Sequence, residues 1–176
     1  MTEKLTKAQV KDLNCQYLPL LTVKNGDEYL SNSAERSARI RRKLDCQLDL
    51  PYGDSSGQML DVFPGRFKDT PVHVFIHGGY WRSMDKDDHA FVALGFVPEG
   101  ISVASINYAL TPSVSLDEIV AQVQAAVIWL HANAARASAD PAKLHVCGHS
   151  AGGHLTAAML STDWATRGLP ADTLKS

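Results

Sequence analysis

The segment GHSAGGHL, residues 148–155, decides the fold. It holds the pattern G-x-S-x-G around Ser150, follows the apolar run LHVCG at 144–148, and leads into a helical pattern at 154–165. A strand, a sharp turn and a helix in this order would hold the Ser150 hydroxyl clear of the end of a sheet. The helix N-terminus offers free N–H groups to developing negative charge. We therefore interpret Ser150 as a nucleophile; the alternative is a glycine-rich turn with an incidental serine.

A second glycine-rich segment, HGGYW at 77–81, directly follows the apolar run VHVFI. Glycines let a loop turn its amides toward one point without a side chain in the way. Gly78 would give the loop this freedom. The N–H groups of Gly79 and Tyr80, with that of Ala151, are then expected to form an oxyanion hole.

The pattern around these two segments predicts an α/β fold with a mostly parallel sheet and flanking helices. Apolar, β-branched runs predict buried strands at 72–79, 101–110 and 144–148, preceded by a hairpin of two strands at 46–53 and 57–64. Helices are expected at 89–96, at 154–165 and after Ser115, where Ser115 and Glu118 fit a capping box.

The composition is that of an ordinary globular protein of one-domain size. The 176 residues are 45% hydrophobic and 20% charged, with a formal net charge of −2. This balance lacks the basic excess that accompanies binding to nucleic acid or anionic membranes. No apolar run approaches the ~20 residues of a membrane span, and the charged N-terminus lacks the pattern of a signal peptide. Three widely spaced cysteines suit reduced thiols, so a cytoplasmic location is expected.

The first 45 residues are more polar than the rest of the chain. Short helices are expected at 6–13 and 33–44, and the dense charge pattern of the second is typical of a solvated surface helix. We therefore divide the chain into a polar helical N-terminal extension, residues 1–45, and a partial α/β domain, residues 46–176.

Several motifs occur in an order that resembles a known family. HGGYW, NYALTP at 107–112, the run from SLDEIV to AAVIWL, and GHSAGGHL are similar to the kynurenine formamidase (arylformamidase) branch of the α/β-hydrolases. The wider group of hormone-sensitive-lipase-like esterases carries HGGG, a Y-x-L-x-P element and GDSAGG. Tyr80 and Trp81 in place of the third glycine favour the formamidase branch. The resemblance covers roughly residues 30–176 and implies an α/β-hydrolase fold.

The resemblance implies a serine hydrolase that converts N-formyl-L-kynurenine, or a related aryl formamide, to kynurenine and formate through an acyl-serine. Ser150 would attack the formyl carbonyl, and no cofactor is implied. Trp81 would contact the substrate and narrow the acyl side of the site; a packing role is its alternative. Two other functions stay open for the chain. It could be a general carboxylesterase for small acyl esters, or a truncated, inactive fragment that binds a partner chain.

A serine nucleophile in this fold needs an acid and a histidine that follow it in the chain. The candidates are His154, Asp163 and Asp172. His154 is expected to point away from the face where substrate approaches Ser150, and Asp163 would lie ~20 Å away along the helix. The resemblance implies that the acid and the base come from strands that follow residue 176.

Without those strands the outer edge of the strand at 144–148 is expected to lie open, so self-association is predicted. His77 would, by the resemblance, hold the loop that it begins. The seven histidines include no H-x-x-x-H pair with an adjacent glutamate, so no metal site is expected.

Overall fold

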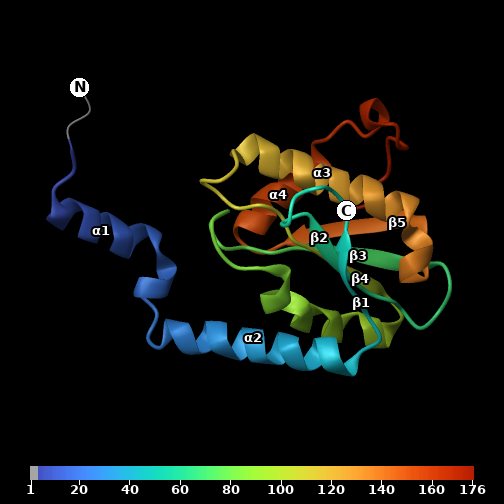
Figure 1. Ribbon diagram of the computed structural model, residues 1–176, viewed down its shortest axis with the longest axis horizontal. Helices are drawn as coiled ribbons and strands as arrows, with labels where there is room; N and C mark the ends of the chain where they lie inside the picture. The colour runs from blue at the N-terminus through green and yellow to red at the C-terminus, as the bar shows by residue number, and fades with distance from the viewer. Residues whose placement is uncertain (1–3) are drawn as a thin grey trace.

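The computed structural model describes residues 4–176, apart from the side-chain environment of Pro19; the first three residues of the predicted N-terminal extension lie outside it. A five-stranded sheet forms its centre, with strand order β1-β2-β4-β3-β5 (Figure 1). The strands are β1 (Gln47–Pro51), β2 (Met59–Phe63), β3 (Thr70–Ile76), β4 (Ser102–Ile106) and β5 (Ala139–Gly148). The β1–β2 and β2–β4 pairs are antiparallel, and the β4–β3 and β3–β5 pairs are parallel. The predicted α/β fold is confirmed, with a mixed sheet.

Helices cover both faces of this sheet (Figure 1). The α-helices are α1 (Lys7–Tyr17), α2 (Gly26–Lys43), α3 (Leu116–Ala132) and α4 (Ala151–Leu160). The 3₁₀ helices are η1 (Pro19–Leu21), η2 (Lys86–Gly95), η3 (Val97–Glu99), η4 (Ala134–Ala137) and η5 (Ala165–Arg167). The larger apolar core lies between the sheet and α3 and α4, and a smaller one lies beneath α2 and η2. None of the helices in the described part is long and apolar enough to cross a membrane.

The sequence explains the placement of α3 and η2. Ser115 accepts a hydrogen bond from the Glu118 N–H at 3.2 Å, which begins α3 at the predicted residue. The apolar residues of α3 then recur at helical spacing and are buried against the sheet. The helix predicted at 89–96 is a 3₁₀ helix that begins at Lys86, because Asp85 caps it one turn earlier through the N–H of Asp87.

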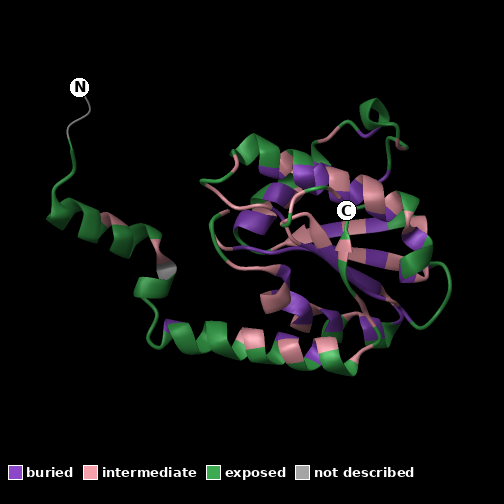
Figure 2. Ribbon diagram, viewed as in Figure 1, coloured by how far each residue is buried: buried purple, intermediate pink, exposed green. Residues whose placement is uncertain are grey.

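The two N-terminal helices differ from the prediction in length and in burial. Both are longer than expected, and α1 contains no buried residue (Figure 2). In contrast, α2 buries Ser37 and Ile40 and packs on η2, so it is not solvated on all sides as expected. One of the charges of α2 faces the protein: the Nε of Arg41 lies 3.2 Å from a carboxylate oxygen of the fully buried Asp61.

Asp61 lies at the centre of a group of paired charges that we name the Lys86 ion cluster; its members are Arg41, Asp49, Asp61, Lys86 and Asp87. The Lys86 Nζ lies 2.7 Å from Asp49 Oδ1, 2.6 Å from Asp87 Oδ1 and 3.1 Å from Asp61 Oδ1. Burial alone lowers the pKa of Lys86, but the hydrogen bonds to Asp49 and Asp87 outweigh it and raise the pKa. The three carboxylates are close enough to hold a metal ion, but the Lys86 ammonium lies among them.

The outer edge of β5 is partly paired. The Val146 N–H donates to the Ser176 carbonyl at 2.7 Å, and the Lys175 N–H donates to the Leu144 carbonyl at 2.9 Å. The expectation of an open edge is therefore wrong at residues 144–146, because the chain returns after α4 and runs parallel to β5. Self-association stays a prediction, which light scattering at several concentrations checks.

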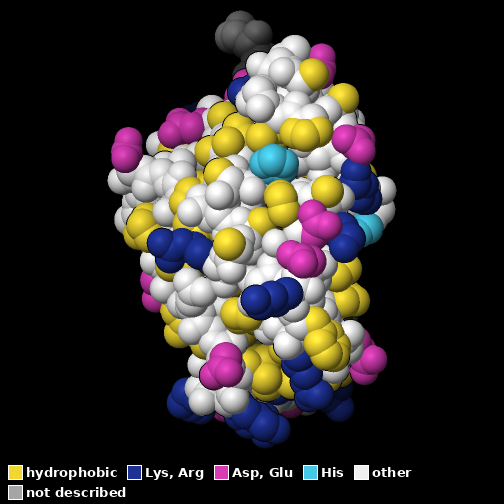
Figure 3. Space-filling view, turned by 90° about the vertical axis from the view of Figure 1, so that its right-hand side faces the viewer, with side chains coloured by type: hydrophobic (Ala, Val, Ile, Leu, Met, Phe, Trp, Pro, Cys, Tyr) yellow, Lys and Arg dark blue, Asp and Glu magenta, His cyan; other side chains and the backbone are white. Residues whose placement is uncertain are grey.

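Acidic and basic side chains are interspersed over most of the face in Figure 3, and basic side chains gather at its lower end. This mixture agrees with the small formal net charge of −2.

Candidate active site

Ser150 lies in the turn between β5 and α4, with φ 53° and ψ −115°. A non-glycine residue with positive φ is strained, and such strain is found at functional turns. The two flanking glycines are required by close backbone contacts. A Cβ on Gly152 would lie 2.0 Å from the carbonyl oxygen of Ile76 on β3, and a Cβ on Gly148 would lie 2.2 Å from the Gly152 carbonyl oxygen. The turn can form only because both positions lack side chains.

The loop after β3 is also held in an unusual backbone conformation. Gly79, Tyr80 and Trp81 have φ values of 106°, 58° and 57° in succession. The Gly79 carbonyl accepts hydrogen bonds from the N–H groups of Arg82 and Ser83, which close the loop. A Cβ on Gly79 would lie 2.0 Å from the Ser83 carbonyl oxygen, so only glycine fits there.

This loop and the Ser150 turn touch. A Cβ on Gly78 would lie 2.8 Å from the His149 carbonyl oxygen and 3.3 Å from the Ser150 Cβ. Within residues 4–176, the N–H groups of Gly79, Tyr80 and Ala151 donate no hydrogen bond. Free N–H groups beside a serine hydroxyl fit the predicted oxyanion hole, which stays a prediction.

His77 supports the loop from beneath and is fully buried. Its Nδ1–H donates to the Gly78 carbonyl at 2.7 Å, and its Nε2 lies 3.0 Å from the Asn107 Oδ1. The Tyr108 hydroxyl donates to the His77 carbonyl at 2.8 Å, and the two rings stack with centroids 4.2 Å apart. Burial lowers the pKa of His77, which favours the neutral ring. These contacts fix the loop, as the resemblance implied for this histidine.

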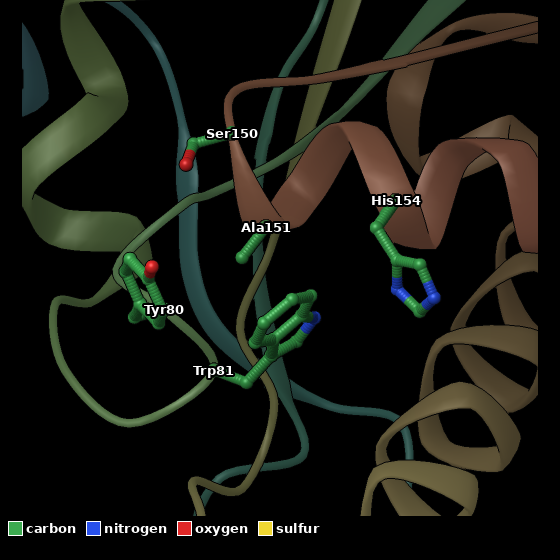
Figure 4. A pocket seen from close by; sticks show the side chains of 5 residues that line it. All are labelled: Tyr80, Trp81, Ser150, Ala151 and His154. Atoms are coloured by element: carbon green, nitrogen blue, oxygen red, sulfur yellow. The ribbon is translucent and has the colours of Figure 1, made fainter. Parts of the chain in front are cut away.

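A hollow of about 380 Å³ opens beside the serine (Figure 4). It is lined by Tyr80, Trp81, Ser150, Ala151 and His154. In Figure 4 the Trp81 indole lies between the Tyr80 ring and the His154 imidazole, and the Ser150 hydroxyl lies on the Tyr80 side. The structure thus brings together all the predicted site residues: Ser150 and Ala151 from the turn, and Tyr80 and Trp81 from the loop that Gly78 and Gly79 allow.

His154 differs from the prediction. Its side chain was expected to point away from the approach of substrate, yet it lines the same hollow as Ser150. The reason is helical spacing, because residues four apart lie on one face of a helix and α4 begins at Ala151. That spacing was the signal in the sequence. In Figure 4 His154 lies on the far side of Trp81 from Tyr80, and among residues 4–176 no hydrogen bond joins it to the Ser150 hydroxyl, so it forms a wall of the hollow.

The structure describes no base for Ser150. Within residues 4–176 its hydroxyl has no hydrogen bond to a histidine or a carboxylate. The Asp163 carboxylate accepts a hydrogen bond from the Ala165 N–H, and Asp172 pairs with Lys175; neither lines the hollow.

The comparisons with known proteins agree with this geometry. The family model BD-FAE matches residues 60–173. The chain belongs to the BD-FAE family. It is an α/β-hydrolase of the kynurenine formamidase-like kind: 36% of residues are identical to "Kynurenine formamidase" of Danio rerio over 137 residues, which cover 77% of this chain and 44% of that protein. "Esterase LipC" of Mycobacterium tuberculosis is 32% identical over 110 residues, covering 60% of this chain and 27% of its own.

A solved structure of similar fold extends the comparison. The crystal structure of a protein from Silicibacter sp. TM1040, proposed to be a thioesterase, superposes with a TM-score of 0.73 at 33% identity. The match covers 82% of this chain and 53% of that one. This BD-FAE chain spans about half the length of the curated formamidases that it matches.

Proposed function

We propose that the Ser150 site serves a serine hydrolase that converts N-formyl-L-kynurenine, or a related aryl formamide, to the arylamine and formate. The observation that carries the proposal is the strained Ser150 turn beside three backbone N–H groups that have no partner among residues 4–176. The aromatic hollow next to it suits an aryl substrate. The similarity to relatives named "Kynurenine formamidase" supports this substrate class.

In the proposed reaction the Ser150 oxygen attacks the formyl carbonyl and loses its proton to a base. The oxyanion accepts hydrogen bonds from the N–H groups of Gly79, Tyr80 and Ala151. The C–N bond then breaks, and the arylamine leaves with a proton. Water attacks the formyl-serine, releases formate and restores the hydroxyl, so one water is consumed for each amide cleaved.

The proposal requires a base that reaches Ser150 from outside residues 4–176, because no described histidine bonds its hydroxyl. Serine enzymes without their histidine keep a residual acceleration of roughly 10³–10⁴ over water from the oxyanion hole and binding alone. Imidazole added to the solution can take the place of the missing base. Such chemical rescue makes the function testable in this chain.

A general carboxylesterase is the second candidate. The esterase relatives from Mycobacterium tuberculosis favour it. So does the size of the hollow, which exceeds the space that a formyl group needs. The two candidates differ in the acyl group and in the leaving group that they prefer.

The experiment measures hydrolysis of N-formyl-L-kynurenine and of p-nitrophenyl butyrate by this chain with increasing imidazole. Ser150→Ala is the matched control. Its rate measures hydrolysis by imidazole itself and is subtracted from the rate of the chain. The proposal predicts a Ser150-dependent rate on N-formyl-L-kynurenine that rises with imidazole. A Ser150-dependent rate on the butyrate ester alone would favour the carboxylesterase. Equal rates for the chain and the control on both substrates would contradict both candidates and favour a partner-binding fragment.

A further inference from the structure

The proposed reaction leaves one side chain of the hollow without a role. His154 is exposed on the first turns of α4, and its imidazole makes no hydrogen bond or ion pair with any residue from 4 to 176. An exposed imidazole in a hollow can still donate or accept a hydrogen bond toward a ligand. Its nitrogens are therefore available to whatever enters beside Ser150.

The Trp81 indole is positioned by both its backbone and its neighbour. The Trp81 carbonyl accepts hydrogen bonds from the Thr111 N–H at 2.8 Å and the Thr111 hydroxyl at 3.2 Å. The indole N–H is buried and lacks a hydrogen-bond partner in the described part of the chain. In Figure 4 it lies on the side of the indole that faces His154. The imidazole packs at 90° to the indole with ring centroids 5.3 Å apart.

The aromatic rings form a continuous wall. Tyr80 and Trp81 meet edge to face at 6.0 Å, and Trp81 and His154 meet in the same way at 5.3 Å. Edge-to-face pairs leave ring surface for a further aromatic group to pack against. The wall extends from the Ser150 hydroxyl to the exposed imidazole, so an amide held at the serine would direct its leaving group along it (Figure 4).

We propose that His154 determines specificity for the leaving group. Together with Trp81, which this proposal assigns to the leaving-group side and not to the acyl side expected from the sequence, it forms the wall against which the aryl ring of the substrate packs. Its imidazole hydrogen-bonds a polar substituent, such as an acyl oxygen, on that ring. This inference rests on the proposed function, since it assigns the aryl side of the same site.

Binding of three formamides to the Ser150→Ala chain tests the proposal, because that background prevents turnover. The probes are 2′-formamidoacetophenone, formanilide and N-cyclohexylformamide, and their binding is followed by NMR through the signals of each formamide, which every variant can report. We expect formanilide to bind about fivefold tighter than N-cyclohexylformamide, from aromatic packing. We expect 2′-formamidoacetophenone to bind about fivefold tighter again than formanilide, because its acyl oxygen accepts a hydrogen bond.

Variants separate the two contributions. His154→Ala should weaken the preference for formanilide and remove the increment from the acyl group. His154→Phe should keep the preference for formanilide over N-cyclohexylformamide and lose the increment from the acyl group. His131→Ala, in the last turn of α3, is the matched control and should bind like the parent. Unchanged preferences in His154→Ala, or no preference in the parent chain, would overturn the proposal. Preferential binding without Ser150-dependent hydrolysis would contradict only the proposed function, and hydrolysis without preferential binding only this inference.

Discussion

The Ser150 site and the Lys86 ion cluster both border the central sheet and are built in opposite ways. At the site, Ser150, Tyr80 and Trp81 have positive φ, and within residues 4–176 the N–H groups of Gly79, Tyr80 and Ala151 are unpaired. In the cluster, the fully buried Asp61 carboxylate has cations on both sides. Strained, unsatisfied sites persist only where the surrounding structure holds them. From this difference we expect the cluster to stabilise the fold and the Ser150 site to be free to react.

Loss of one charge from the cluster should give the largest effect. Lys86→Met leaves Asp49, Asp61 and Asp87 facing one another with Arg41 as their remaining cation, and should lower the free energy of unfolding by about 3 kcal/mol. Urea denaturation followed by circular dichroism measures this loss. The matched control is Lys143→Met, whose Lys143–Asp140 pair is 49% and 29% exposed and should change stability by under about 1 kcal/mol. Equal losses would show that the cluster does not stabilise the fold.

Substitution of a glycine in the Ser150 turn should give the second-largest loss of stability. Gly152→Ala forces a Cβ to 2.0 Å from the Ile76 carbonyl oxygen, so we expect a loss of about 2 kcal/mol from strain and displaced backbone. The adjacent Gly153→Ala meets its nearest atom at 3.6 Å and should stabilise α4 by up to about 1 kcal/mol. Thermal melts of both variants provide the comparison. Similar melting temperatures would contradict the close contact between the turn and β3.

The smallest effect concerns pH. Burial lowers the pKa values of His73, His77 and His89, which lie on β3, at its end and on η2. The neutral forms of these three histidines contribute fully to the stability of the fold above the unfolded pKa of about 6.5. This contribution is lost as the pH falls below that value toward the lower pKa of the folded state, because the unfolded chain binds protons first. The melting temperature should therefore decrease as the pH is lowered from about 7.5 to about 5. His89→Gln should make the fall shallower; an unchanged slope would exclude His89 as a cause.

The Ser150 turn and the loop at 77–81 could be predicted because their signals are local. Glycine spacing and a strand–turn–helix order determine which backbone comes close. The Lys86 ion cluster could not be predicted in this way. Arg41, Asp61 and Lys86 are far apart in the chain, and each alone is typical of a solvated residue. Pairing of residues 174–176 with β5 is also a long-range contact that no local pattern encodes.

The position of His154 on α4 was predicted, but the direction of its side chain was not. Its place one turn after Ser150 followed from the sequence, but its contact with Trp81 depends on side-chain conformations in two separate segments. The positions of Ser150 and of the free N–H groups are thus encoded locally, whereas the contact between Trp81 and His154 is determined by tertiary packing.

The most direct test of the account is to find where an acyl group attaches. The chain is mixed with an activated formyl ester and quenched, and the formyl group is located by mass spectrometry of its peptides. An activated ester needs little help to acylate the serine, while a missing base slows the attack of water, so the formyl-serine should accumulate. The account predicts a formyl group on Ser150 and its absence from the same peptide of Ser150→Ala. Equal formylation of that peptide in both chains, or none on Ser150, would contradict it.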